Sequence, residues 1–278
     1  MSKQPKMRMG PGGEGAHWYA PSPDGALCAY QIEMTSKPGQ WRDCNLRDAR
    51  KFGLYPSVSK ITRIENAEQL NRWGRLQAAL SAATLPGIDE VGDEKEWFAA
   101  IEKDWKQQVK DAATGGTGIH QAVEEYFAGE VYKDEFAPHV DAAHKAINSI
   151  VSDPWHLDDF QTEESVTHPY GYGGRCDIYS RKLNMVLDFK SKEFDADTRL
   201  DVYANQGQAL AAYREALGMP TARCFNIYLS RDNPGLYRVC EHPQDKLKNY
   251  WHQFAALLYF WQVQNNVPLL SDPYSIAL

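Results

Sequence analysis

The chain has 278 residues, of which 43% are hydrophobic and 24% charged, a composition typical of globular proteins with one large domain or two small ones. No apolar run approaches the roughly 20 residues that a membrane-spanning helix requires, and the first fifteen residues lack the apolar stretch of a secretion signal. Five cysteines without tight spacing predict reduced thiols. We therefore expect a cytoplasmic protein with no membrane partner.

The net charge of −7 does not suggest a nucleic-acid-binding protein, but the charge is unevenly distributed. Residues 1–80 hold 12 Lys and Arg against 7 Asp and Glu, whereas residues 81–170 hold 6 against 19. The basic residues of the first segment could follow a phosphate backbone or form an ordinary solvated surface. They are Arg42, Arg47, Arg50, Lys51, Lys60, Arg63, Arg72 and Arg75.

The first half of the chain begins with a Gly-rich segment, residues 1–16, for which we predict disorder. Apolar residues on both sides of a Pro-Ser-Pro-Asp-Gly turn predict a β-hairpin over 17–33. Ser57 or Ser59 is a suitable N-cap for a helical region that continues to Leu80 and ends at Leu-Pro-Gly.

A second helical pattern covers residues 93–112, and the glycines of 115–118 are predicted to end it. A new helix is expected to start at Ile119, and another to cover 136–152. We predict that residues 17–112 form a β-hairpin and a helical region that could arch over a DNA end. Aromatic residues of this half could stack on bases or lie in a core, and for Trp73 the core is the better interpretation.

The second half, residues 113–278, has the order of a mixed α/β unit. Strands are predicted over 160–168, 174–180, 185–191, 224–230 and 237–240, with helices over 197–217 and 244–264. Gly218 is placed to cap the first of these helices. The fold class is therefore predicted as α/β, with a central mixed β-sheet flanked by helices and a mainly helical N-terminal region.

The most informative residues lie on two neighbouring strands of this sheet. Asp177 ends the first, and Asp188 and Lys190 lie two residues apart on the second, so their side chains point to the same face. A carboxylate and an ammonium on a mostly buried strand require desolvation, which a functional role would explain. Strand-end aspartates that bond to turns are the alternative, but the group of three favours a divalent-cation site for phosphodiester hydrolysis.

Four further residues could complete this site. Glu163 and Glu164 point to opposite faces of the preceding strand, and we favour Glu164 as the one that reaches the cation. The carbonyl oxygen of Phe189 lies between the two residues of the Asp-x-Lys pair and is a further candidate ligand. Gln206 is a polar residue on an otherwise apolar helix face that also carries Tyr203, so its amide needs a partner.

Five elements occur in a fixed order: Gly116-x-x-x-His120, Glu164, Gly-Arg-Cys-Asp177, Asp188-Phe-Lys190 and Tyr203-x-x-Gln206. In this order the chain resembles the PD-(D/E)XK nuclease superfamily, whose core is restriction-endonuclease-like, and within it the RecB-type nucleases. Residues around Pro56-Ser57-Val58 and the Glu-Ser-Val-x-His sequence are more loosely similar to phage exonucleases and the mitochondrial genome maintenance exonuclease.

This resemblance implies roles for the individual residues. Asp177, Asp188 and His120 would bind Mg²⁺ or Mn²⁺, Lys190 would assist the attacking water, and the helix of Tyr203 and Gln206 would support the site. A mixed nitrogen and oxygen ligand set somewhat favours Mn²⁺. A lone histidine in a helix is otherwise more often a packing or capping residue.

The resemblance further implies a metal-dependent DNA exonuclease that leaves 5′-phosphate and 3′-hydroxyl ends in phage-type recombination, repair or degradation. DNA ends are then the substrate, and a single-strand-binding or annealing protein is a compatible partner. An endonuclease, an RNA-processing nuclease and a catalytically silent DNA-binding scaffold are the alternatives. Some relatives bind an iron–sulfur cluster through cysteines grouped near the C-terminus, a pattern this chain lacks, so we predict no cluster.

Overall fold

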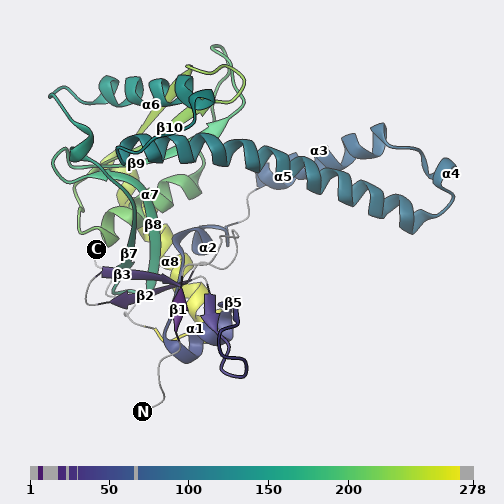
Figure 1. The fold of residues 1–278 in the computed structure, drawn as a ribbon, viewed down its shortest axis with the longest axis horizontal. Coiled ribbons are helices and arrows are strands. Elements are labelled where there is room, and N and C mark those ends of the chain that lie inside the picture. Colours follow the sequence, from purple (N-terminus) through teal and green to yellow (C-terminus); the bar gives the residue numbers. More distant parts are fainter. Residues whose placement is uncertain (1–5, 9–17, 23–24, 30, 66–67, 270–278) are drawn as a thin grey trace.

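The computed structural model describes residues 6–8, 18–22, 25–29, 31–65 and 68–269. A five-stranded mixed sheet forms its centre, in the order β11-β10-β9-β8-β7 (Figure 1). Only β9 and β10 are parallel; the other neighbours are antiparallel. These strands are β7 (Gln161–His168), β8 (Tyr172–Ser180), β9 (Met185–Lys192), β10 (Arg223–Ser230) and β11 (Tyr237–His242). The predicted mixed sheet flanked by helices is confirmed.

Helices cover both faces of the sheet because its strands carry apolar side chains on both sides. On one face, α5 (Glu94–Phe127) and α6 (Ala137–Ile150) enclose a cluster that includes Leu187 and Ile227. On the other face, α7 (Ala204–Ala216) and α8 (Gln244–Gln264) cover Val186 and Cys224. The crossover from β9 to β10 runs through α7, as a parallel pair requires.

Three features of this half differ from the predicted elements. The helix expected over 197–217 begins only at Ala204, while Gly218 does follow its end with a φ of 65°. The predicted break at 115–118 does not exist, because α5 continues through these glycines to Phe127. A β-carbon on Gly116 would lie 2.7 Å from Ser191 Oγ, and one on Gly118 2.6 Å from the Phe136 ring. The glycines therefore allow close packing of the helix rather than ending it.

The N-terminal region contains two small sheets. The first consists of β1 (Met7–Arg8), β4 (Gln31–Glu33) and β5 (Trp41–Asp43), and the second of β3 (Gly25–Ala29), β2 (Trp18–Ser22) and β6 (Tyr55–Pro56). The predicted hairpin exists as β2 and β3, but the residues from Gln31 onward pair in the other sheet. Within the range predicted to be disordered, residues 1–16, the structure describes Lys6 and the two residues of β1, and the rest lies outside the described residues.

Short helices connect this region to the core. They are α1 (Leu46–Phe52) and α2 (Val58–Thr62), and Ser57 caps the second, as predicted, by accepting a hydrogen bond from Lys60 N. Val58 and Ile61 of α2 are fully buried in a cluster with Phe254 and Leu258 of α8. The predicted helical region after Ser57 is divided, because α2 ends at Thr62 and the next helix starts at Glu68.

A helical arm projects from the body (Figure 1). It consists of α3 (Glu68–Thr84), α4 (Ile88–Val91) and the N-terminal part of α5, whose N-cap is Asp93. The two long helices are joined by a hydrogen bond of 2.7 Å from Ser81 Oγ to Asp104. The side chain of Trp73 lies outside the described residues. None of the described helices is long and apolar enough to cross a membrane.

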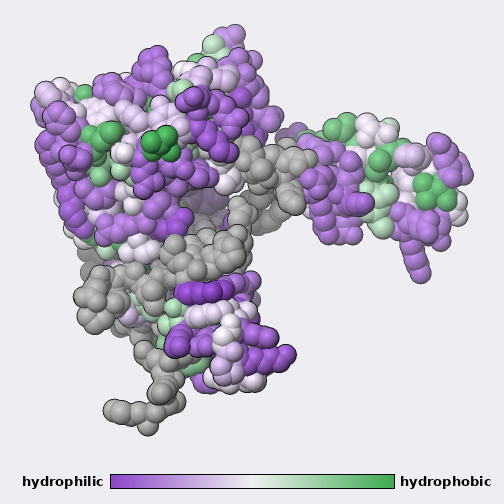
Figure 2. Space-filling model, viewed as in Figure 1, coloured by the Kyte–Doolittle hydropathy of each residue, from purple (hydrophilic) through white to green (hydrophobic). Residues whose placement is uncertain are grey.

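The surface of the arm is mostly polar with scattered apolar side chains (Figure 2). Four large apolar residues of the arm are at least two-fifths exposed, namely Leu76, Leu80, Ile88 and Phe98. Exposed acidic residues gather around the turn between α4 and α5: Asp89, Glu90, Asp93, Glu94 and Glu96. The tip of the arm is therefore acidic, while the exposed Arg72 lies closer to the body.

Candidate functional site

The site lies where the central strands part. Strands β8 and β9 pair at Ser180–Met185, Tyr179–Val186 and Ile178–Leu187, and the ladder then ends. Asp177 and Asp188 are the next residues of the two strands, so both aspartates stand at the opening. The ladder between β8 and β7 is interrupted at the same point, because it passes from Thr162–Ile178 directly to Glu164–Cys176.

Backbone irregularity explains why acidic side chains gather at this point. Glu163 lies opposite Asp177 in the interrupted ladder and has a φ of 53°, in the left-handed region. Cys176 packs beneath α7, whereas Ile178, two residues later, packs beneath α5 and α6. Regular alternation would place both on one face. The interruption at Asp177 therefore turns this side chain and that of Glu163 out of the regular pattern.

Asp188 is fixed by partners on both of its oxygens. Lys190 Nζ lies 2.5 Å from Oδ1, and Asn226 Nδ2 donates to Oδ2 at 2.6 Å. Asn226 faces Asp188 across the parallel β9–β10 pair and is fully buried. The predicted pair Asp188 and Lys190 thus shares one face, and Asn226 is a partner that sequence reasoning missed, because no spacing in the sequence predicts which strand neighbours β9.

His120 reaches the aspartates from α5. Its Nε2 lies 2.6 Å from Glu124 Oε1 and 3.6 Å from Asp177 Oδ2. The approach depends on the close packing of α5 against β9 at Gly116, one helical turn before the histidine. The structure therefore brings together four of the predicted residues: His120, Asp177, Asp188 and Lys190.

The structure places Glu163, rather than Glu164, beside His120 and Glu124. Ligand atoms of His120, Glu124 and Glu163 all lie within 4.8 Å of one another. Glu164 is exposed and accepts a short hydrogen bond from Tyr179. The expectation for Glu164 assumed regular alternation along β7, whereas the left-handed backbone at Glu163 breaks that alternation. The part that either glutamate plays at a cation stays a prediction.

The electrostatics of the site follow from crowded, buried carboxylates. Burial raises the pKa of Asp177 to about 7, opposed by His120 and supported by the charge of Asp188. Burial and the neighbouring Glu124 raise the pKa of Glu163 to about 8. The carboxylates of Asp177 and Glu124 outweigh burial and raise the pKa of His120 to about 9. Burial lowers the pKa of Lys190, but the carboxylates of Asp188 and Asp177 raise it above its usual value.

The residues present fit a divalent cation. Asp177 Oδ2 is buried and has no hydrogen-bond partner among the described residues, although His120 Nε2 lies 3.6 Å away, and a buried oxygen without a hydrogen bond is costly. Around it stand three more carboxylates and an imidazole, the ligand types that Mg²⁺ and Mn²⁺ accept. Phe189 lies beyond the last β8–β9 pair with its side chain buried, so its carbonyl oxygen stays a predicted ligand.

Tyr203 and Gln206 lie at the N-terminus of α7. Gln206 Oε1 accepts from Tyr228 Oη at 2.6 Å and from Tyr203 N at 3.3 Å, so this amide caps the helix. The rings of Tyr203 and Tyr228 lie 4.5 and 4.9 Å from Lys192 Nζ. The Tyr-x-x-Gln pair therefore holds the aromatic surroundings of Lys192, the next residue after Lys190 on the same face of β9.

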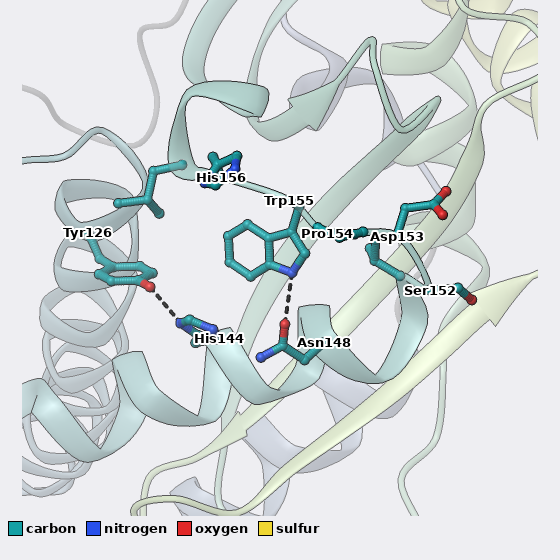
Figure 3. A pocket seen from close by; sticks show the side chains of 10 residues that line it. Tyr126, His144, Asn148, Ser152, Asp153, Pro154, Trp155 and His156 are labelled. Atoms are coloured by element: carbon teal, nitrogen blue, oxygen red, sulfur yellow. Dashed lines mark hydrogen bonds between the residues drawn. The ribbon is translucent and has the colours of Figure 1, made fainter.

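A separate cavity of 530 Å³ lies at the C-terminal end of α5 (Figure 3). Trp155 donates to Asn148 at 2.8 Å, and the Tyr126 hydroxyl lies 2.6 Å from His144 Nδ1. Both pairs connect α6 to its neighbours along the cavity wall. The lining, Tyr126, His144, Asn148 and residues 151–157, includes none of the predicted site residues.

Comparisons with known proteins find only remote similarity. No family model matches the chain, and no curated protein matches it. It is similar to a crystal structure from Eubacterium rectale described as "Putative exonuclease", with 15% identity and a TM-score of 0.37 over 55% of this chain and 68% of that chain. A structure of SSO0001 shows 17% identity and a TM-score of 0.25 over 46% of this chain and 62% of that chain. Any account of the function therefore depends on the site itself.

Proposed function

We propose that the chain is a metal-dependent DNA exonuclease that hydrolyses phosphodiester bonds and leaves 5′-phosphate and 3′-hydroxyl ends. One observation carries the proposal: Asp177, Asp188 and Lys190 meet where β8 and β9 part, and Asp177 Oδ2 is buried there with no hydrogen bond from any residue that the structure describes. Such an arrangement is unfavourable for folding alone, and a bound cation would compensate for it.

Asp177, Asp188 and His120 would hold Mg²⁺ or Mn²⁺, with the Phe189 carbonyl as a further ligand. Glu163 takes the place first given to Glu164, directly or through water. A divalent cation at this point supplies a nucleophilic water at neutral pH and neutralises charge on the phosphate. Around the same opening, the Glu124 carboxylate holds the His120 ring, and the Glu163 carboxylate pairs with the Arg175 guanidinium.

Lys190 acts on the substrate side of the site. Its ammonium is held 2.5 Å from Asp188 and keeps its charge because two carboxylates raise its pKa. Ammonium has three donors, so two remain to orient the attacking water or to stabilise the charge that develops on the phosphate. The acidic surroundings do not exclude DNA, because the cation reverses the charge that a phosphate meets.

The arm supports a preference for DNA ends. Helix α5 runs from the arm into the site and carries His120, so the arm and the site share one helix. The segment that could arch over a DNA end, residues 17–112, stays a prediction. Contacts with phosphate would come from Arg72 rather than from the acidic tip.

A cleavage assay tests the proposal. End-labelled linear and circular DNA, single- and double-stranded, are incubated with the protein and Mg²⁺, Mn²⁺ or EDTA, beside Lys190→Ala. We expect the wild-type protein to degrade linear DNA but not circular DNA, and only when a divalent cation is present. The Lys190→Ala variant should degrade neither. Cleavage of circular DNA would identify an endonuclease. Cleavage of RNA substrates included in the same panel would identify an RNA-processing enzyme. DNA binding without cleavage under every condition would reject the proposal in favour of a scaffold.

A further inference from the structure

A buried polar chain runs from the site into the sheet. Asp188 Oδ2 accepts from Asn226 Nδ2 at 2.6 Å, and Asn226 Oδ1 lies 2.7 Å from His242 Nε2. The three residues come from neighbouring strands β9, β10 and β11, and all are at most 8% exposed. Asn226 is fully buried, so its amide has no access to water in place of these two partners.

The hydrogen-bond donors and acceptors of Asp188, Asn226 and His242 have one consistent arrangement. An ionised carboxylate only accepts, so the Asn226 amide must turn its NH₂ toward Asp188 and its oxygen toward His242. His242 Nε2 must then carry a proton and donate it. Burial lowers the pKa of His242 and keeps the ring neutral. A reversed amide would place its oxygen against Asp188 Oδ2, two acceptors with no proton between them, and its NH₂ against the proton on His242 Nε2.

The hydrogen-bonded series of Asp188, Asn226 and His242 leaves the Asp188 carboxylate free to bind a cation. Each of its oxygens has one hydrogen-bond partner, Lys190 on Oδ1 and Asn226 on Oδ2, and each keeps a lone pair. Without Asn226, the carboxylate could rotate and form a two-oxygen pair with Lys190, which would reduce its charge for the cation. Outer partners of metal ligands typically contribute 10- to 100-fold in metal affinity.

We propose that Asn226 and His242 are positioning residues, which orient the Asp188 carboxylate for a divalent cation through a hydrogen-bonded chain across three strands. This inference rests on the proposed function, because it concerns the same cation. Neither residue touches the substrate. Their effect is therefore on cation affinity, and on the rate only where the cation is not saturating.

Matched variants separate positioning from folding. Asn226→Ala and His242→Phe remove the hydrogen bonds that link His242 to Asp188, whereas His242→Gln keeps a side-chain N–H that can donate to Asn226. Ser230→Ala is the control: Ser230 lies on the same strand, is fully buried and donates to Phe194 O at 2.6 Å, away from Asp188. Mn²⁺ affinity is measured by calorimetry on the full chain, with melting temperatures and the Mn²⁺ dependence of cleavage.

We expect Asn226→Ala and His242→Phe to weaken Mn²⁺ binding about tenfold or more, with cleavage at saturating Mn²⁺ within a few-fold of the wild type. His242→Gln should restore most of the affinity, and Ser230→Ala should lower the melting temperature without changing affinity. Mn²⁺ affinities of the first two variants within twofold of the wild type would overturn the positioning role alone. Wild-type protein that binds no Mn²⁺ would overturn the proposed function and this inference together.

Discussion

At the scale of single residues, the site depends on the irregular backbone at Glu163, which no sequence pattern predicts. Asp177, Asp188 and Lys190 could be predicted, because strand alternation places the last two on one face and a turn brings the first alongside. Glu163 could not, because its left-handed φ of 53° reverses the facing that alternation predicts. Asn226 and His242 were missed as well, since their role depends on the order of strands in the sheet.

Substitution of the adjacent glutamates tests directly which of the two acts at the site. Glu163→Gln should reduce metal-dependent cleavage about tenfold or more, because it removes a carboxylate from the cluster with His120 and Glu124. Glu164→Gln should remain within a few-fold of the wild type, because this side chain is exposed and bonded to Tyr179. Cleavage rates under limiting Mn²⁺ make the comparison. A larger loss of cleavage in Glu164→Gln than in Glu163→Gln would show that Glu164 is the glutamate that acts at the site.

At the scale of elements, helix α5 connects the arm to the site. Its 34 residues extend about 51 Å at 1.5 Å per residue, and they include the glycines that were predicted to end it. Glycine is a weak helix former, so the sequence alone favoured a break. The deciding factor is tertiary: the helix passes so close to Ser191 and Phe136 that no β-carbon fits at Gly116 and Gly118.

Two helical glycines should therefore respond in opposite directions to the same substitution. Gly118→Ala should destabilise the fold by about 1–3 kcal/mol, because the new methyl group would lie 2.6 Å from the Phe136 ring. Gly74→Ala should stabilise it by about 1 kcal/mol, since a β-carbon in α3 meets nothing within 4 Å. Urea unfolding measures both changes. Equal effects would show that helix propensity, not close packing, governs Gly118.

The charge of the arm makes a second prediction at this scale. Arg72→Ala, in a Lys190→Ala background that prevents cleavage, should weaken DNA binding and reduce the slope of log K against log salt by about 0.7–0.9. Lys95→Ala is the matched control, because Lys95 is exposed among the acidic residues of the tip. Fluorescence anisotropy over a salt series gives both slopes. A larger effect at Lys95 would place the DNA at the tip instead.

At the scale of the whole molecule, the N-terminal region and the α/β core share one interior. Tyr172 of β8 is fully buried in the same cluster as Trp18 and Leu54, and its hydroxyl donates to Ala212 O of α7. The order of strands and helices in the core could be predicted from apolar periodicity and turn residues. The pairing of Gln31–Glu33 with β1 and β5 could not, because short strands carry too little pattern to specify their partners.

A half-buried histidine at this junction should make the fold sensitive to acid. His168 is enclosed by Tyr170, Tyr172 and Trp251, and burial lowers its pKa to about 4. Its Nδ1 accepts from Tyr170 N at 3.2 Å, so the neutral ring is the folded form. Between pH 6.5 and 4 the unfolded chain binds a proton that the folded chain does not, and stability falls as the pH is lowered.

His168→Gln keeps an acceptor for Tyr170 N but cannot titrate in this range. The free energy of unfolding of the variant should therefore decline less than that of the wild type between pH 7 and pH 4.5. Urea unfolding at a series of pH values measures both proteins. Parallel curves would show that His168 does not contribute to acid sensitivity.

The central claim is that Asp177 and its neighbours hold a divalent cation that enables phosphodiester hydrolysis. The most direct measurement is a calorimetric Mn²⁺ titration of the wild type and Asp177→Asn, with the same samples assayed on end-labelled linear DNA. We predict that the nearly isosteric substitution weakens Mn²⁺ binding at least tenfold and abolishes cleavage, while the fold is kept. Unchanged Mn²⁺ affinity and unchanged cleavage in Asp177→Asn would contradict the claim.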